Sequence, residues 1–239
     1  MLTSTRTIRQ NNMFSTKETP TVKRRSKGEQ TRLLILQSAI EVLAKNGIKG
    51  TTHRAIASHA NIQLSLTTYY FKDIQELVHQ AFTLCSSQIT TKTSLAWQPA
   101  VELLANVNKT SLRKISEKEN LRNKLAKMAT QYLVKRIIDS PVELAVQQLL
   151  FTEVRVNRKL APLAELHRAA SLKPIIKLCE FFNAHDPHID ADIIATVFTQ
   201  IEYRNINVPV EQLDTDNIQA IVSRVIGYAM NLKSLALTS

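Results

Sequence analysis

The stretch that decides the fold is residues 31–77, TRLLILQSAIEVLAKNGIKGTTHRAIASHANIQLSLTTYYFKDIQEL. Apolar residues recur at three- and four-residue spacing across residues 29–46, which predicts one amphipathic helix. Thr52 can cap a second helix of about two turns, and residues 64–71 are compatible with a third short helix. Two short helices joined by a tight turn indicate a helix-turn-helix at residues 52–71.

Two residues suit the ends of these helices, and a pair of acids suits the start of the next one. Gly47 readily adopts the left-handed conformation of a helix end, and Asn61 is one of the few other residues that tolerate it. Asp73 and Glu76 form an N-terminal capping pair, after which apolar residues continue at helical spacing to Ile89. The sequence therefore predicts a long fourth helix directly after the helix-turn-helix.

This stretch resembles the DNA-binding domain of the TetR family of transcriptional regulators, the tetracycline-repressor family. The matching positions are Thr31, Arg32, Ala39, Val42, Leu43, Gly47, Thr52, Ile56, Ala57, Ala60, Ile62, Tyr70, Phe71 and Leu77. Three positions depart from the family pattern: Asn61 replaces the usual Gly of the turn, Thr68 replaces a Tyr, and Ile74 stands where Lys or Arg is common. Beyond this domain the resemblance rests on the number of helices and on DADIIATVFTQIEYR at residues 190–204.

The resemblance implies an all-α homodimer, in which an N-terminal three-helix DNA-binding domain with a helix-turn-helix precedes a larger helical domain for ligand binding and dimerisation. We expect a disordered basic arm at residues 1–27, the DNA-binding domain at 28–88 and the ligand-binding and dimerisation domain at 89–239. The implied function is sequence-specific transcriptional regulation, as a cytoplasmic repressor that an unidentified small-molecule inducer releases from a double-stranded DNA operator.

The residue types of the helix-turn-helix suit contact with DNA. The Gln63 amide can read a base edge, the short hydroxyl side chains can donate to phosphates or bases, and the leucines can meet a thymine methyl group. Arg54 stands at the start of the second helix, where the positive helix end favours phosphate. The expected contact residues are Thr52, His53, Arg54, Gln63, Leu64, Ser65, Leu66, Thr67, Thr68, Tyr69, Tyr70 and Lys72. Packing against the first helix is the alternative for Tyr69 and Tyr70, whereas Phe71 is expected in the core.

The positive charge of the chain is concentrated at its N-terminal end. Residues 1–72 carry 12 Lys or Arg against three Glu, a net charge of +9, while residues 73–239 carry the other 19 against 17 acids, a net charge of +2. This distribution favours a polyanion-binding N-terminal module, with a merely solvated basic tail as the alternative. It disfavours a DNA-compacting architectural protein, which needs basic surface throughout. The basic cluster at residues 23–27 either enters the minor groove or stays solvated.

The sequence lacks the commonest enzyme motifs. Its four glycines are Gly28, Gly47, Gly50 and Gly227. They cannot form a dinucleotide-binding fingerprint or a P-loop, and the acid pairs at residues 190–192 and 214–216 are better explained as helix caps. Cys85 and Cys179 lie far apart without zinc-ligand spacing around them. We therefore expect no enzymatic activity, which leaves an all-α enzyme as a remote alternative, and no cofactor, disulfide or metal site.

No targeting or membrane segment is expected either. No apolar run approaches the ~18 residues of a membrane span, and the N-terminal segment lacks the apolar stretch of a secretory signal. A transit peptide is disfavoured because residues 1–17 have no apolar helical face. Met13 and Met1 are both candidate starts of translation.

The rest of the chain predicts further helices, for a total of nine or ten. Their expected starts are marked by Pro99, Ser116, Pro141, Pro162, Asp190 and Asp214. Pro174 is expected to kink the helix in which it lies.

Candidates for a ligand pocket and a dimer interface come from these helices. The ligand candidates are Trp97, Met128, Tyr132, Phe151, Glu153 and His167, all at spacings that ordinary core or surface residues also show. Among them Glu153 is the most distinctive, as the lone acid within an apolar run. The dimer is expected to form through residues 162–183 and 190–205, because a monomer would leave an apolar stripe partly exposed. The stripe consists of Ile194, Val197, Phe198 and Ile201.

Overall fold

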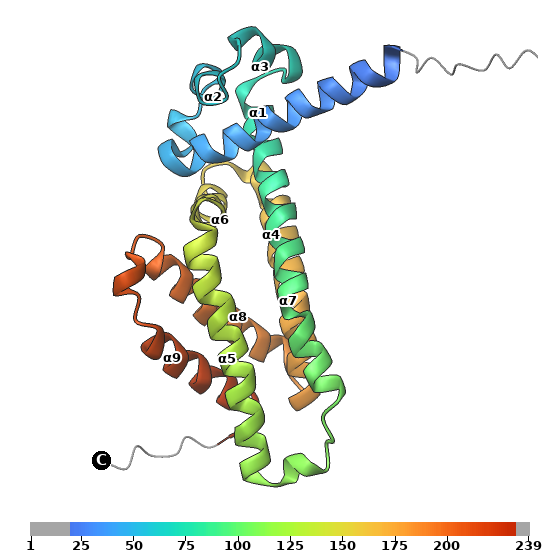
Figure 1. Ribbon diagram of the computed structural model, residues 1–239, viewed down its shortest axis with the longest axis vertical. Coiled ribbons are helices and arrows are strands. Elements are labelled where there is room, and N and C mark those ends of the chain that lie inside the picture. Colours follow the sequence, from blue (N-terminus) through green and yellow to red (C-terminus); the bar gives the residue numbers. More distant parts are fainter. Residues whose placement is uncertain (1–19, 233–239) are drawn as a thin grey trace, which may run out of the picture.

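The structure, a computed structural model, describes residues 20–232, which form nine α-helices and three short 3-10 helices without a β-strand. The helices are α1 (Pro20–Gly50), α2 (His53–His59), α3 (Leu64–Tyr70), α4 (Ile74–Ala105), α5 (Ile115–Asp139), α6 (Pro141–Glu153), α7 (Ala161–Phe182), α8 (Pro187–Asn205) and α9 (Thr215–Ala229). Helices α1–α3 make a small head at one end of an elongated body (Figure 1). The predicted all-α fold with an N-terminal helix-turn-helix is confirmed.

The turn between α2 and α3 depends on Asn61, which has a φ of 51°. The N–H of Asn61 donates to the carbonyl oxygen of Ser58 at 3.3 Å, and the N–H of Ile62 donates to that of Ala57 at 3.0 Å. This pair of hydrogen bonds is the Schellman motif, which satisfies the last carbonyl groups of a helix. Gly47 interrupts α1 differently, with a φ of 63° and a ψ of −177°. The predicted left-handed end at Asn61 is confirmed, whereas Gly47 has a positive φ but lies outside the left-handed helical region.

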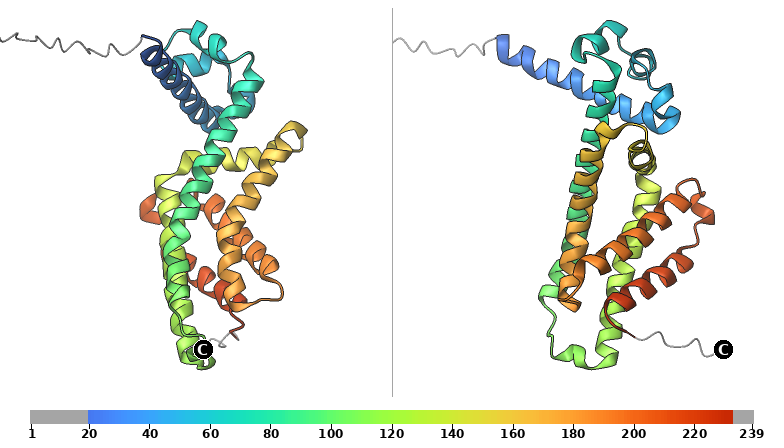
Figure 2. Two further views of the ribbon diagram at one scale, coloured as in Figure 1. Left: turned by 90° about the vertical axis from the view of Figure 1, so that its right-hand side faces the viewer. Right: turned by 180° about the vertical axis from the view of Figure 1, so that it is seen from behind.

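Helix α4 leaves the head and runs along the body beside α7 (Figure 2). Asp73 caps α4 by accepting a hydrogen bond from the N–H of Glu76 at 2.8 Å, and the Glu76 carboxylate accepts one from the N–H of Lys72 at 2.9 Å. The predicted capping pair is therefore confirmed. The helix start predicted at Pro99 is wrong, because Pro99 lies inside α4. The helix continues past this proline because residues on both sides of it are buried in the body at helical spacing.

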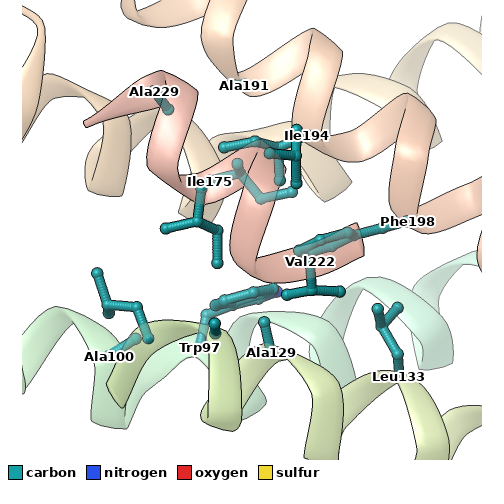
Figure 3. Close-up of a cluster of buried hydrophobic side chains, with 14 of the residues drawn as sticks. Trp97, Ala100, Ala129, Leu133, Ile175, Ala191, Ile194, Phe198, Val222 and Ala229 are labelled. Carbon is teal, nitrogen blue, oxygen red and sulfur yellow. The ribbon is translucent and has the colours of Figure 1, made fainter. Parts of the chain in front are cut away.

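Two hydrophobic cores hold the molecule together, which we call the head core and the body core. The head core combines residues of α1, α2 and the first half of α4 with Val146 and Leu150 of α6 and with Leu163 and Ala164 of α7. The body core joins the second half of α4 to α5, α7, α8 and α9 around Trp97 (Figure 3). Since α4 and α7 contribute to both cores, no linker separates head from body. The domain boundary expected after residue 88 falls within the continuous helix α4.

Most of the other predicted helix starts agree with the structure to within a residue, namely Ser116 for α5, Pro141 for α6, Pro162 for α7 and Asp214 for α9. Helix α8, however, begins at Pro187 instead of Asp190, because a proline is well suited to the first turn of a helix. Residues 20–27, expected in a disordered arm, form the first turns of α1, and residues 1–19 lie outside the described part of the chain. Pro174 lies within α7, which continues to Phe182.

The apolar stripe predicted for the dimer interface is not on the surface. Ile194, Phe198 and Ile201 are 7%, 5% and 2% exposed and belong to the body core, where Phe198 lies against Trp97 (Figure 3). Val197 is only partly buried. The pattern identified the apolar face of α8, but helices of the same chain cover that face. The prediction that these three residues face a partner subunit is therefore wrong.

Candidate DNA-binding surface and ligand cavity

The outer face of α3 carries a set of exposed side chains suited to DNA contact. Gln63 immediately precedes α3 and makes no capping hydrogen bond with its side chain, so its amide stays available. Ser65, Thr68 and Tyr69 are exposed, and Leu64 is 43% exposed. The expected residues at these five positions therefore share one accessible surface of the head.

Thr67 is a predicted contact residue that the structure places inside the head. It is 0% exposed, and its hydroxyl donates to the carbonyl oxygen of Leu64 at 2.8 Å. The prediction that Thr67 contacts DNA is therefore wrong, because the inner face of this short helix must pack on the rest of the head. Leu66 is half-buried on the same helix.

The two adjacent tyrosines have different surroundings. Tyr69 is 80% exposed, whereas Tyr70 is half-buried and lies with its ring edge-on to Tyr69, at 5.0 Å between centroids. The Tyr70 hydroxyl lies so close to Gly28 of α1 that a Cβ there would be only 3.4 Å from it. The hydroxyl end of Tyr70 therefore lies against α1, in line with the packing alternative, and its contact with DNA stays a prediction. Phe71 is fully buried, as predicted.

Helix α2 and its flanks add cations and a hydroxyl to the surface. The Thr52 hydroxyl accepts a hydrogen bond from the N–H of Ala55 at 3.1 Å, which confirms the predicted cap and leaves the hydroxyl proton free to reach a phosphate. Arg54 and Lys72 are exposed, while His53 is half-buried. These residues place positive charge on the flanks of the reading helix.

We expect Arg54 and Gln63 to affect DNA binding in different ways. Arg54→Ala should lower the slope of log affinity against log salt by about one unit, equally for all sequences, because it removes one phosphate contact. Gln63→Ala should relax the preference at one base position, at a cost of ~1–3 kcal/mol for the preferred base. Fluorescence anisotropy on duplexes selected from a random pool measures both effects. Lys124→Ala, an exposed cation on α5, is the matched control, and a salt slope that responded equally to Arg54→Ala and Lys124→Ala would contradict the assignment.

A cleft of about 350 Å³ opens between α7 and α8, next to α6. Its volume lies in the range of small-molecule sites. The cleft is lined by Gln147, Phe151, His167, Arg168, Ser171, Leu172, Asp192, Ala195, Thr196, Thr199, Gln200 and Tyr203. Most of these side chains are polar, and Arg168 pairs with Asp192 at 3.0 Å across the two helices.

An inner pocket of about 60 Å³ adjoins this cleft and shares four lining residues with it, Gln147, Ser171, Ala195 and Thr199. Trp97, Tyr132 and Phe198 form aromatic walls of the inner pocket, and Arg136 and Glu202 supply its charged groups. A third, apolar pocket of about 40 Å³ shares Trp97, Phe198 and Ile175 with the inner one. The three spaces therefore follow one another from a polar opening to an apolar end.

Arg136 is the centre of a buried polar network. Its guanidinium donates to the Tyr132 hydroxyl at 3.2 Å, to the Thr93 hydroxyl at 3.3 Å and to the side-chain Oε1 of Gln147 at 3.2 Å. The Gln147 amide in turn donates to the Tyr203 hydroxyl at 3.2 Å. The network therefore joins α4, α5, α6 and α8 around the inner pocket.

Glu202 is the anionic partner of Arg136. Its Oε1 lies 2.9 Å from Arg136 Nε, but the Nε–H is not directed at that oxygen, so the contact is an ion pair without a well-formed hydrogen bond. Burial raises the pKa of Glu202, and the positive charge of Arg136 opposes that rise. Glu202 as a whole is 5% exposed, and it lines the inner pocket.

His167 connects the cleft to α4. Its Nδ1 lies 2.8 Å from the Ser86 hydroxyl, and the two residues are 2% and 7% exposed. The ring meets Phe151 edge-on, at 5.7 Å between centroids. Burial and, secondarily, the charge of Arg136 lower the pKa of His167 to about 4, so the imidazole is neutral at physiological pH.

The predicted ligand residues are thus only partly brought together. Trp97, Tyr132, Phe151 and His167 line the connected spaces, whereas Met128 packs against the body core and Glu153, half-buried at the end of α6, lines none of them. The acid in the pocket wall is Glu202, which sequence reasoning missed together with Arg136 and Gln147. A charged residue on an otherwise apolar helical face was the available signal for both members of the ion pair.

The neutral state of His167 predicts a specific loss of stability in acid. An unfolded histidine ionises near pH 6.5 and folded His167 only near 4, so its contribution is fully present above pH 6.5 and is lost as pH falls towards 4. His167→Gln should therefore reduce the fall in unfolding free energy between pH 7 and pH 4 by on the order of 3 kcal/mol. Urea unfolding across this range measures it, with His79→Gln at an exposed position as the control. An unchanged pH dependence in His167→Gln would be incompatible with a neutral buried imidazole.

Two other kinds of site find no support among residues 20–232. No described helix is both long and apolar enough to cross a membrane. Within the same part of the chain, no three His, Cys, Asp or Glu side chains cluster so as to hold a metal ion.

Comparison with known proteins shows which family model and which solved structures this chain is similar to. Residues 35–81 match the model of the bacterial regulatory proteins of the tetR family, and no curated protein matches the chain. A putative TetR-family transcriptional regulator from Mesorhizobium loti MAFF303099 has a similar structure, with 12% identity, 86% of this chain and 97% of that chain covered, and a TM-score of 0.65. A putative transcriptional regulator from Streptomyces coelicolor A3(2) is similar too, with 19% identity, 82% of this chain and 98% of that chain covered, and a TM-score of 0.56.

The multidrug-binding protein EbrR in complex with malachite green is also similar, with 20% identity, 81% of this chain and 96% of that chain covered, and a TM-score of 0.54. At these identities the solved structures establish a shared fold. The family match covers the second part of α1, the whole helix-turn-helix and the start of α4. Residues 35–81 of this chain thus match the tetR family of bacterial regulatory proteins, and the chain as a whole shares its fold with solved regulators of that kind.

Proposed function

We propose that the protein is a dimeric repressor that reads an operator through α3 and is released from it when a small molecule binds the cleft between α7 and α8. The observation that carries this proposal is the shared use of α7. Ala164 belongs to the head core, and His167 and Arg168, one turn further along the same helix, line the cleft. A ligand that moves this part of α7 therefore acts directly on the packing of the head.

The polar contacts of α4 support the same coupling. The Ser86 hydroxyl pairs with His167 of the cleft wall, and Gln80, two turns nearer the head, accepts a hydrogen bond from Arg32 of α1. The Arg32 guanidinium also lies over the Phe71 ring, 5.3 Å from its centroid. A change at the cleft can therefore reach Phe71, at the end of α3, through two contacts of α4, one at Ser86 and one at Gln80.

Ligand binding is further supported by a structural relative. EbrR, which shares the fold at 20% identity, is described as a multidrug-binding protein and is complexed with malachite green. A body of this architecture can thus hold a small molecule. The cleft of about 350 Å³ is a suitable place for one in the present chain.

The proposed dimer uses the outer face of α8. Ile189 and Ile193 are 58% and 49% exposed, and they are followed at four-residue spacing by the partly buried Val197. Residues at this spacing form one apolar strip along a helix, and exposed strips of this kind mark protein interfaces. Two reading helices set about one DNA turn, ~34 Å, apart would then engage two half-sites. As the partner is an operator, the proposed location is the cytoplasm.

The runner-up is a ligand-independent DNA-binding or architectural protein. Only the net charge of +2 over residues 73–239 speaks against extensive wrapping of DNA. Mapping of bound sites on the native genome discriminates the two, since a repressor occupies few specific sites and an architectural protein many.

We expect Ile193→Asp to abolish dimerisation without unfolding the subunit, because it places a charge in the proposed interface but outside the body core. Phe198→Asp should instead lower the thermal stability, because its side chain is 5% exposed and packs against Trp97. Analytical ultracentrifugation and circular dichroism separate the two effects. A wild-type chain that stays monomeric at micromolar concentration would remove the basis for the dimer.

The coupling itself is tested by reciprocity. For a compound selected by thermal shift, saturating operator should weaken its binding by the same factor, about tenfold to a hundredfold, by which the compound weakens operator binding. Ser86→Ala should reduce this factor while the affinity of the operator alone is retained. Ser87→Ala, at the exposed neighbouring position, should preserve the factor. Compound affinity that does not respond to operator would exclude induction through this cleft.

A further inference from the structure

Glu202 of the inner pocket lacks the partners that a buried carboxylate normally has. Among the described residues no N–H or O–H group donates a well-formed hydrogen bond to either of its oxygens, and its charged neighbour Arg136 forms an ion pair with it without such a bond. Buried carboxylates usually accept several hydrogen bonds, because desolvation without them is costly. Glu202 therefore presents unused acceptor capacity to the inner pocket.

The charges that line the connected spaces are already paired one to one. Arg136 faces Glu202 at 2.9 Å in the inner pocket, and Arg168 faces Asp192 at 3.0 Å in the cleft. A cation brought to Glu202 would come close to Arg136, and an anion brought to Arg136 would come close to Glu202. Either ion would be buried with like charge nearby and without a counter-ion of its own, which is unfavourable in a desolvated site.

The other residues that line the cleft and the inner pocket indicate two further properties of a suitable ligand. Ser171 and Thr199 line both the cleft and the inner pocket, and their hydroxyls make no hydrogen bond with a described residue, so they can donate or accept. Trp97 and Phe198 stack with their ring centroids 6.0 Å apart and line both the inner pocket and the apolar pocket. The inner pocket thus shares polar residues with the cleft and aromatic residues with the apolar pocket.

We propose that the cleft and inner pocket take an uncharged molecule whose hydroxyl or N–H group donates a hydrogen bond to Glu202 and whose apolar ring or chain packs against Trp97 and Phe198. Alcohols, phenols and amides with an apolar skeleton have this chemistry. This inference rests on the proposed function, in which the cleft is the ligand site.

Trp97 provides a direct readout, since it is the only tryptophan of the chain and lines the inner pocket. Four compounds with one skeleton, none of which absorbs where tryptophan does, distinguish the effect of a hydrogen-bond donor from that of a charge. They are cyclohexylmethanol, its methyl ether, cyclohexylmethylammonium and cyclohexanecarboxylate. Titration of the full-length protein at pH 7, followed by Trp97 fluorescence, should show the alcohol binding at least tenfold more tightly than the other three. A hydrogen bond to a charged group is worth this factor or more.

A paired substitution assigns the preference to Glu202. The double variant Arg136→Met and Glu202→Met removes both charges together, so that no unpaired charge is buried. It should bind the alcohol and the ether within about threefold of each other. The control removes another ion pair, Lys92 and Glu143 at 2.8 Å, by the same substitutions and should retain the preference of the wild type.

The titration of the wild-type protein decides the proposal even where the double variant does not fold. Equal affinity for alcohol and ether, tighter binding of either ion, or no response of Trp97 to any of the four compounds would overturn it. Operator affinity, measured separately on the same preparation, distinguishes this failure from failure of the proposed function. A protein that binds its operator but shows no preference for the alcohol contradicts only the proposed ligand chemistry.

Discussion

Helix α4 must fit two packing surfaces at the same time, and the rest of the structure depends on this constraint. Its first turns are buried in the head core, where Leu77 and Phe82 are almost completely inaccessible, while Trp97 near its other end lies in the body core. Close-packed interiors do not deform gradually, because small displacements bring atoms into overlap or open voids. A helix held at both ends therefore moves as a unit, and α7 beside it shares both attachments. The proposed control of DNA binding by the body depends on this double attachment.

The buried network around Arg136 is polar, in contrast to the two hydrophobic cores. Burial of a guanidinium and a carboxylate costs several kcal/mol for each ion, and an apolar pair of similar volume is often as stable. The network is nevertheless built into the body and lines the inner pocket through Tyr132, Gln147 and Glu202. Its position at a cavity agrees with a role in recognition, since a solid core gains little from such groups. It also holds four helices in one arrangement around the pocket.

The local features of the head could be predicted because they depend on neighbouring residues. The cap at Thr52, the capping pair at Asp73 and Glu76, and the left-handed turn at Asn61 each involve groups within a few residues of one another. The predictions failed where burial by distant segments decided the outcome. Thr67 was predicted on the DNA side of α3 but packs inside the head, and the apolar face of α8 is covered by its own chain.

The sequence by itself determined the helical class, the position of the helix-turn-helix and the basic character of the N-terminal region, because helical periodicity, capping residues and charge are properties of short stretches. Only the tertiary structure decided which residues meet in the cavity. Arg136 and Glu202 lie on different helices far apart in the chain, and the contact of Arg136 with Tyr132 on its own helix does not indicate the pair with Glu202. The continuity between head and body was likewise a tertiary result. It follows from residues of α6 and α7 that enter the head core across long sequence distances, and no local pattern encodes such contacts.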